Sequence, residues 1–286
     1  MSDTEAHELD RTPVTVVVGA TSKWRSDGAN TLYAHGGRVE DDGLPLESRW
    51  GLGGALAQRF AGEGHRVVLT TRQRANAVDL AEVITSLGGE CAIVELDVAS
   101  PESIQDAFST IRSEVGDPDV LIYNAGYMAG RQLPKEQELL EHFPPQLFDE
   151  AMAIACRGPF LVAKEVLPAM RRRRSGSIFF SNNHHSLRGR KRLTGESLYY
   201  PRTMMRALAQ ALTEEYSEFG VHIANVVVDG FIDSPGTRAL EQFKDGHEGL
   251  INPAAIAAAF AYLHQQDPSG WTHELQLTPS MSAPSF

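Results

Sequence analysis

The chain contains little cysteine and no long apolar run. Two cysteines in 286 residues, Cys91 and Cys156, allow neither a disulfide framework nor a cysteine-rich zinc site. No apolar run approaches the roughly 20 residues of a membrane-spanning helix, and the polar, acidic start lacks the basic and apolar regions of a secretory signal. We therefore expect a cytoplasmic protein that does not interact with membranes.

Basic side chains are outnumbered by acidic ones. Lysine and arginine total 26 against 37 aspartates and glutamates, which gives a net charge of −11 and an isoelectric point near 5.4. Nucleic acids attract clustered basic side chains, so no nucleic-acid partner is expected. Hydrophobic residues make up 42% of the chain, enough for the core of one large domain or two small ones.

Short β-branched runs alternate with segments of helical periodicity. Strands are predicted over 14–18, 67–71, 92–96, 120–123, 177–181, 222–228 and 271–277. Helices are predicted over 54–62, 75–87, 104–115, 148–174 and 202–219. This alternation favours parallel pairing through right-handed crossovers. The expected fold is a single α/β domain, a doubly wound (Rossmann) parallel sheet with helices on both faces.

One segment, 23–50, interrupts the alternation between the first strand and the first helix. It is rich in glycine and charge, whereas connections at this point normally span a few residues. Its basic residues Lys23, Arg25, Arg38 and Arg49 leave two alternatives, a flap that meets a phosphate or a solvated excursion. The predicted organisation is a polar arm (1–12), a domain that includes the insert (13–278) and a tail (279–286).

Glycines flank the insert on both sides. With the insert set aside, Val18-Gly19-Ala20-Thr21-Ser22 continues into Gly51-Leu52-Gly53-Gly54. Glycines after a first strand let the backbone approach a pyrophosphate, and the following helix directs its N-terminal amides toward it. The turn is interpreted as a nucleotide-binding turn, with an ordinary glycine-rich turn as the alternative.

This arrangement resembles the short-chain dehydrogenase/reductase family, whose turn has the form T-G-x-x-x-G-x-G. The family's Asn-Ala-Gly corresponds to 124–126, its aspartate after the third strand to Asp97, and its Pro-Gly to Asp229-Gly230. The resemblance implies a Rossmann-fold oxidoreductase for a small-molecule substrate, with a substrate lid at 231–252 and a homodimeric or homotetrameric assembly. The cofactor-binding residues that it implies are Gly19, Thr21, Ser22, Gly51, Leu52, Gly53, Arg72, Asp97, Val98, Asn124, Ala125 and Gly126.

The charge at the tip of the second strand bears on the choice of nucleotide. A carboxylate there accepts hydrogen bonds from the adenosine ribose and repels a 2′-phosphate, whereas an arginine has the reverse effect. The chain has Arg72-Gln73-Arg74 and no acid at this point. NADP(H) is therefore favoured over NAD(H), the alternative being two solvated loop arginines.

The family's catalytic Tyr-x-x-x-Lys pair is altered. Counting back from Gly220 puts Arg202 at the lysine position and Leu198 at the tyrosine position, with Tyr199 next to it. Pro201 is suited to the first turn of a helix, so Tyr199 is expected in the preceding loop. Arginine retains the positive charge but does not release its proton.

The family's other two catalytic positions are altered as well. Asn183 aligns with the serine that orients the carbonyl, and an amide can donate the same hydrogen bond. Ala155 aligns with the asparagine of a water relay and cannot replace it. The expected catalytic roles are Tyr199 as the acid, Arg202 as the cation beside it and Asn183 as the orienting group.

Two adjacent histidines follow Asn183. His184 or His185 is an alternative proton donor, because imidazole titrates near neutral pH. Tyr200 is a further alternative. A polar surface loop is the simpler interpretation. No cysteine or carboxylate with ligand spacing stands beside them, so no metal site is expected.

Three functions are compatible with these residues. The first is NADP(H)-dependent hydride transfer to or from a carbonyl, an alcohol or an activated C=C bond of a small molecule. The second is a nucleotide-binding pseudoenzyme or sensor, because the tetrad is altered. The third is a non-redox lyase similar to halohydrin dehalogenases, which have arginine at the lysine position but have lost the glycines that this chain retains.

Overall fold

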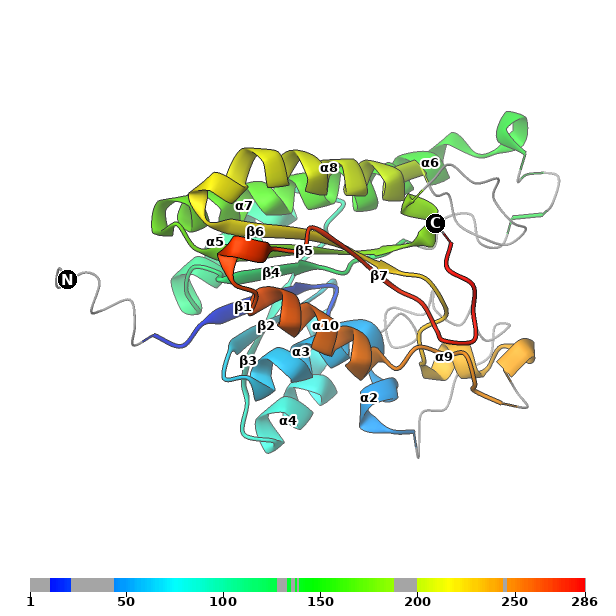
Figure 1. Cartoon of the computed structure of the whole chain (residues 1–286), viewed down its shortest axis with the longest axis horizontal. Coiled ribbons are helices and arrows are strands. Elements are labelled where there is room, and N and C mark those ends of the chain that lie inside the picture. Colours follow the sequence, from blue (N-terminus) through cyan, green and yellow to red (C-terminus); the bar gives the residue numbers. More distant parts are fainter. Residues whose placement is uncertain are drawn as a thin grey trace.

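The computed structural model describes residues 11–21, 44–127, 133–134, 137, 139–187, 200–243 and 246–285. Within these residues a seven-stranded sheet has the order β3-β2-β1-β4-β5-β6-β7, and neighbouring strands are parallel. Helices α5, α7 and α8 lie on one side of the sheet and α3, α4 and α10 on the other (Figure 1). The predicted single doubly wound Rossmann sheet is confirmed.

The predicted strands are all present, with small shifts of their ends. The strands are β1 (Val14–Val18), β2 (Arg66–Thr71), β3 (Glu90–Glu95), β4 (Val120–Tyr123), β5 (Gly176–Asn183), β6 (Val221–Val228) and β7 (Glu274–Leu277). The helices are α2 (Leu46–Arg49), α3 (Gly51–Gly62), α4 (Val78–Ser86), α5 (Pro101–Glu114), α6 (Pro145–Met152), α7 (Gly158–Arg173), α8 (Tyr200–Tyr216), α9 (Pro235–Arg238) and α10 (Pro253–His264). In the part of the chain that the structure describes, no helix is both long and apolar enough to span a bilayer.

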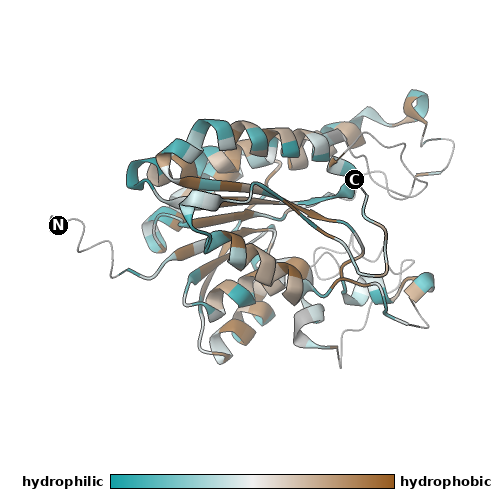
Figure 2. Ribbon diagram, viewed as in Figure 1, coloured by the Kyte–Doolittle hydropathy of each residue, from teal (hydrophilic) through white to brown (hydrophobic). Residues whose placement is uncertain are grey.

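The central strands are buried on both faces. Every residue of β1 is buried, and its side chains alternate between two hydrophobic clusters. Val16 and Val18 pack in the cluster under α5, α7 and α8, whereas Val17 packs in the cluster formed with α3 and α10. Figure 2 shows largely hydrophobic strands between the two layers of helices, with hydrophilic residues on the outer side of α8. Burial of β-branched side chains on both faces is typical of a parallel sheet.

Two helical regions differ from the prediction. Helix α10 was not predicted, although Asn252 caps it by accepting a 2.8 Å hydrogen bond from the Ala254 amide and Pro253 occupies its first turn. Its sequence is apolar on nearly all sides, so it lacks the one-faced pattern that identifies a surface helix. The segment predicted as one helix over 148–174 is divided into α6, the π-helical turn η5 (Ala153–Arg157) and α7.

A buried histidine, His65, and a partly buried one, His264, lie together at the amino ends of the strands. His65 Nδ1 is 2.7 Å from Thr15 Oγ1, and His264 Nδ1 is 2.9 Å from Ser177 Oγ. The two imidazole rings are 5.4 Å apart, centroid to centroid, in an edge-to-face arrangement. Both rings are thus held by hydroxyl groups of the sheet.

These histidines resist protonation. Burial lowers the pKa of His65 and outweighs the attraction of Asp119 and Glu63, which acts in the opposite direction. Burial lowers the pKa of His264 as well, and the neighbouring His65 lowers it further. His222, at the start of β6, also has a pKa lowered mainly by burial.

We expect the protein to lose stability in mild acid because of these histidines. Below about pH 6.5, the unfolded chain takes up protons that the folded imidazoles resist, so the free energy of unfolding falls as the pH falls toward the folded-state pKa values. Urea unfolding between about pH 7.5 and about pH 5.5 measures this slope. His264→Gln should reduce the slope, and the exposed His142→Gln should leave it unchanged. An equal slope in wild type and His264→Gln would contradict this assignment.

Candidate functional site

The glycine turn at the carboxyl end of β1 is packed too closely for side chains. Gly19 has a φ of 82°, which favours glycine. A Cβ on Gly53 would lie 2.3 Å from the Gly19 carbonyl oxygen and 2.8 Å from that of Ala20. Asn124 donates a 3.0 Å hydrogen bond from Nδ2 to the same Gly19 oxygen. The first turn of α3 therefore lies directly against the ends of β1 and β4.

Threonines of β2 hold this turn in place. Thr70 Oγ1 accepts a 3.2 Å hydrogen bond from the Gly19 amide and donates one of 3.0 Å to the Val17 carbonyl. Thr21 and Thr71 place their hydroxyl oxygens 3.3 Å apart. The turn is thus fixed to the neighbouring strand by side chains as well as by the sheet.

The other residues expected at a cofactor site surround the same end of the sheet. Arg72 is exposed after β2, and Asp97 is exposed after β3 with Val98 buried next to it. Ala125 packs against Gly19. Gly51 and Leu52 open α3, Gly126 follows Ala125, and Ser22 lies outside the described residues.

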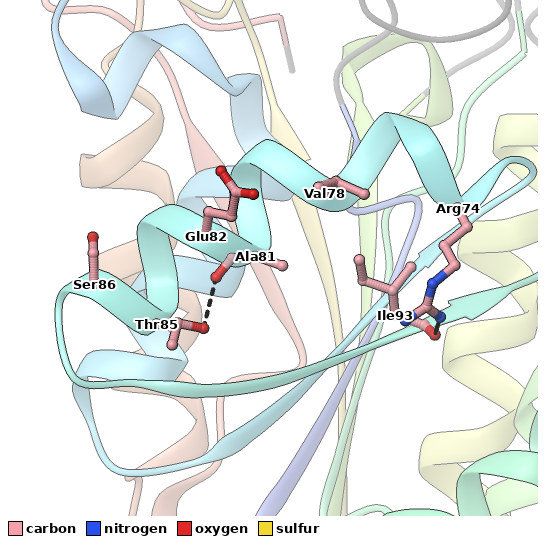
Figure 3. A pocket seen from close by; sticks show the side chains of 7 residues that line it. All are labelled: Arg74, Val78, Ala81, Glu82, Thr85, Ser86 and Ile93. Atoms are coloured by element: carbon pink, nitrogen blue, oxygen red, sulfur yellow. Dashed lines mark hydrogen bonds between the residues drawn. The ribbon is translucent and has the colours of Figure 1, made fainter.

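Arg74, the second arginine at this tip, points elsewhere. Its guanidinium donates a 2.7 Å hydrogen bond to the Ile93 carbonyl, and its amide donates one of 2.8 Å to Glu95 Oε1. It borders an open hollow of about 530 Å³ between α4 and β3 (Figure 3). None of the expected cofactor-binding residues lines this hollow.

The end of the insert is part of the packed core. Trp50 is 2% exposed and lies against Gly54, where a Cβ would be 2.2 Å from that of Trp50. Ser48, in α2, is equally buried and donates a 2.6 Å hydrogen bond to Asp233 Oδ2 in the expected lid. The described end of the insert, residues 48–50, therefore packs against α3 and Asp233. Among its basic residues, Lys23, Arg25 and Arg38 lie outside the described residues.

Asp233 joins the insert to the lid. Arg238 donates to both carboxylate oxygens, at 2.6 and 2.7 Å, from the first turns after β6. Burial acts to raise the pKa of Asp233, but the hydrogen bonds from Arg238 and Ser48 outweigh it, so the pKa is lowered. Arg49, beside Ser48, stacks its guanidinium over the Trp50 ring at 5.2 Å.

Arg202, at the family's lysine position, lies between the ends of β4 and β5. Its guanidinium carbon is 5.4 Å from the centroid of the Tyr127 ring, and Nη1 donates a 3.4 Å hydrogen bond to the Ser181 carbonyl. Asn182 fixes the backbone of α8 by donating from Nδ2 to the Arg202 carbonyl at 3.0 Å. A cation is thus held over an aromatic ring beside the expected substrate position.

Asn183 ends β5 and caps the short helix η6 (His184–Ser186). Its Oδ1 accepts a 3.2 Å hydrogen bond from the His185 amide. Because the accepting atom must be the amide oxygen, this bond distinguishes Oδ1 from Nδ2 of Asn183. The donor Nδ2 then points away from the His185 amide and can donate to a carbonyl. Tyr199 and Leu198 lie outside the described residues, and Tyr200 begins α8 as Pro201 predicted.

Ala155 lies in η5, a π-helical turn, and is fully buried beside Tyr127. The Tyr123 hydroxyl donates to the Ile154 carbonyl in the same turn. Burial raises the pKa of Tyr123, so this phenol stays protonated. The methyl group of Ala155 therefore lies in a buried cluster with Tyr127, at the position where the resembling family has a hydrogen-bonding asparagine.

Two residues of this region were missed by sequence reasoning. Tyr127 directly follows the Asn124-Ala125-Gly126 motif, which was the available signal. Asp229 stands where the family has proline, and its Oδ1 lies 3.4 Å from His184 Nδ1. Nothing in the local sequence of either residue indicates its partner.

Gly53→Ala should destabilise the fold because its new methyl group meets backbone oxygens that cannot move independently. We expect a loss of about 1–3 kcal/mol in the free energy of unfolding, measured by urea titration. Gly62→Ala, in the same helix with no heavy atom within 4 Å of the added Cβ, is the matched control. It should be neutral or stabilising by up to about 1 kcal/mol. Equal effects of the two substitutions would refute the close packing.

Ser48→Ala should weaken the connection between α2 and the lid. Loss of a buried hydrogen bond to a carboxylate should cost about 1–2 kcal/mol and make the 44–50 amides exchange faster with deuterium. Ser86→Ala removes a similar hydroxyl bond at the exposed end of α4 and should leave both quantities nearly unchanged. Unaltered exchange in Ser48→Ala would show that the contact does not hold α2.

Comparisons with known proteins identify the family. The model of a family described as enoyl-(acyl carrier protein) reductase matches residues 47–273. YxbG, an uncharacterized oxidoreductase of Bacillus subtilis, is 28% identical over 78% of this chain and 84% of that protein. The 3-oxoacyl-[acyl-carrier-protein] reductase MabA of Mycobacterium tuberculosis is 29% identical over 77% of this chain and 83% of that protein.

A solved structure has the same fold. A metagenomic short-chain oxidoreductase crystallised with NADP superposes with a TM-score of 0.70 at 21% identity, covering 94% of this chain and 98% of that one. The likeness in fold extends over nearly the whole chain, and the family model covers most of it. The protein belongs to the short-chain dehydrogenase/reductase family of oxidoreductases.

Proposed function

We propose that this protein is an NADP(H)-dependent oxidoreductase that transfers hydride to or from a carbonyl or alcohol, or an activated C=C bond, of a small molecule. The observation that carries the proposal is the contact of Gly53 with the carbonyl groups of Gly19 and Ala20. It brings the N-terminal amides of α3 to the carboxyl end of β1 with no side chain in between, which is the geometry that a dinucleotide pyrophosphate requires.

The residues around this turn fit a dinucleotide. In our proposal, the backbone of Gly19, Gly51 and Gly53 contacts the pyrophosphate, and Asp97 lies beside the adenine. The bound nucleotide supplies the hydride. The remaining residues of the proposed cofactor site are Thr21, Ser22, Leu52, Arg72, Val98, Asn124, Ala125 and Gly126.

The preference for NADP(H) over NAD(H) rests on Arg72. It is exposed at the tip of β2, where a 2′-phosphate would lie, and Arg74 is turned toward β3. The relative named as a complex with NADP supports the same choice.

The proposed substrate lies at the ends of β4, β5 and β6. Asn183 orients a carbonyl through its Nδ2, and Arg202 supplies a fixed positive charge beside the reacting oxygen. Tyr199, the acid expected from the sequence, lies outside the described residues.

Two other functions are tested by the same experiments. Ala155, which cannot anchor a water, favours a nucleotide-binding sensor without turnover. Arg202 is also compatible with a non-redox lyase similar to halohydrin dehalogenases, but the retained glycines favour a bound nucleotide.

Nucleotide binding is the direct test of the proposal. A nucleotide that binds only the folded protein stabilises it by about 2.7 kcal/mol at about 100 times Kd, enough to raise Tm by several degrees. We expect this rise with NADPH, a smaller one with NADH at equal concentration, and none with bromide. No rise with either nucleotide would reject the proposal, bromide alone would favour the lyase, and binding without turnover of any carbonyl would favour the sensor.

Arg72→Ala should reduce the discrimination between the two nucleotides. We expect NADPH affinity to fall about tenfold, or about 1.4 kcal/mol, with little change for NADH, measured by isothermal titration calorimetry. Arg66→Ala, at the opposite end of the same strand, is the matched control and should change neither affinity. Equal losses for both nucleotides would contradict a 2′-phosphate contact.

A further inference from the structure

A histidine and a carboxylate meet beside the proposed substrate position. His184 follows Asn183 directly, and its Nδ1 is 3.4 Å from Oδ1 of Asp229, the residue after β6. The Asp229 side chain is 5% exposed and that of His184 is 26% exposed. The carboxylate is therefore buried behind the imidazole, whereas the imidazole reaches the surface of the site.

The carboxylate of Asp229 is fixed by β7 and the segment that follows it. Its Oδ2 accepts hydrogen bonds from the Ser285 amide, Thr278 Oγ1 and Gln276 Nε2, at 2.8, 3.1 and 2.7 Å. Ser285 Oγ donates a further bond of 2.7 Å to Oδ1. Burial acts to raise the pKa of Asp229, but these bonds outweigh it and lower the pKa, so the group is a carboxylate at neutral pH.

The imidazole of His184 is held on two sides. Asp229 faces its Nδ1, and the His185 ring packs against it with centroids 4.0 Å apart and planes inclined by 46°. A carboxylate at Nδ1 keeps a proton on that nitrogen and makes Nε2, across the ring, the nitrogen that exchanges protons with a ligand. Arg202 cannot take this role because a guanidinium does not give up its proton.

We propose that His184, oriented by Asp229, donates the proton that completes carbonyl reduction in this protein. This inference rests on the proposed function. With NADPH bound, the carbonyl carbon would accept the hydride and its π pair would move to oxygen. That oxygen would form its O–H bond with the Nε2 proton of the His184 imidazolium, which keeps its Nδ1 proton beside Asp229. The carbonyl is reduced to an alcohol, NADPH is oxidised to NADP⁺, and the neutral imidazole regains its proton from water. Asp229 is a positioning residue.

Turnover of a small activated diketone distinguishes whether His184 or Tyr199 donates the proton. NADPH oxidation with 2,3-butanedione is compared in His184→Asn, His185→Asn and Tyr199→Phe, with NADPH binding by calorimetry as the control for folding. In His184→Asn, kcat should fall about 100-fold or more with NADPH affinity retained, and added imidazole should restore part of the rate. The loss of kcat in His184→Asn should exceed the loss in either of the other two variants. A large loss in Tyr199→Phe with an active His184→Asn would overturn the proposal.

A second measurement needs no substrate. In ¹⁵N-histidine-labelled protein, the nitrogen shifts of His184, assigned with His184→Asn, report which nitrogen carries the proton. In the neutral imidazole that remains after proton transfer, we expect the Nδ1–H tautomer in wild type, its loss in Asp229→Asn, and its retention in Ser285→Ala, which removes a tail contact but keeps the carboxylate. An unchanged tautomer in Asp229→Asn, or the same loss in Ser285→Ala, would overturn the role of Asp229. Failure of wild type to bind NADPH would instead reject the proposed function and leave this spectroscopic result to stand by itself.

Discussion

The contact of the first turn of α3 with the end of β1 is the constraint on which the rest of this structure depends. Because Gly53 has no side chain, the helix begins directly against the carbonyl groups of Gly19 and Ala20, and its N-terminal end meets the carboxyl end of the sheet. The insert separates the two halves of this glycine turn in the sequence. Its last residue, Trp50, is buried against Gly54 of α3, so the end of the insert packs in the core and the turn stays closed.

Much of the fold could be predicted because its signals are local. A β-branched run buried on both faces, such as Val14–Val18, identifies a central parallel strand, and short runs alternating with helices indicate a doubly wound parallel sheet. Helix α10 escaped prediction because it is covered on most sides, so its side chains need not alternate between polar and apolar. The π-helical turn between α6 and α7 escaped because its extra residue per turn follows from tertiary packing beneath Tyr123.

Residues of the candidate site could be predicted only where they belong to a sequence motif. The glycines and the Asn-Ala-Gly run have fixed spacing, and Arg202 was located by counting along one helix. The contacts of Ser48 with Asp233 and of His184 with Asp229 join segments far apart in the chain. Such pairs depend on which loops meet at the ends of parallel strands, and no local pattern encodes that meeting.

The family's lysine position is occupied by Arg202, and in our proposal charge stabilisation and proton transfer belong to different residues. Arg202 can hold a positive charge over Tyr127 at any physiological pH, but it cannot pass on a proton. A reductase with this arginine therefore needs a group that titrates nearby and is oriented independently of α8. His184 meets this requirement, because Asp229 is anchored by β7 and the segment after it. In our proposal, Arg202 on α8 stabilises charge, and His184 transfers the proton at the junction between β5, β6 and the C-terminal segment.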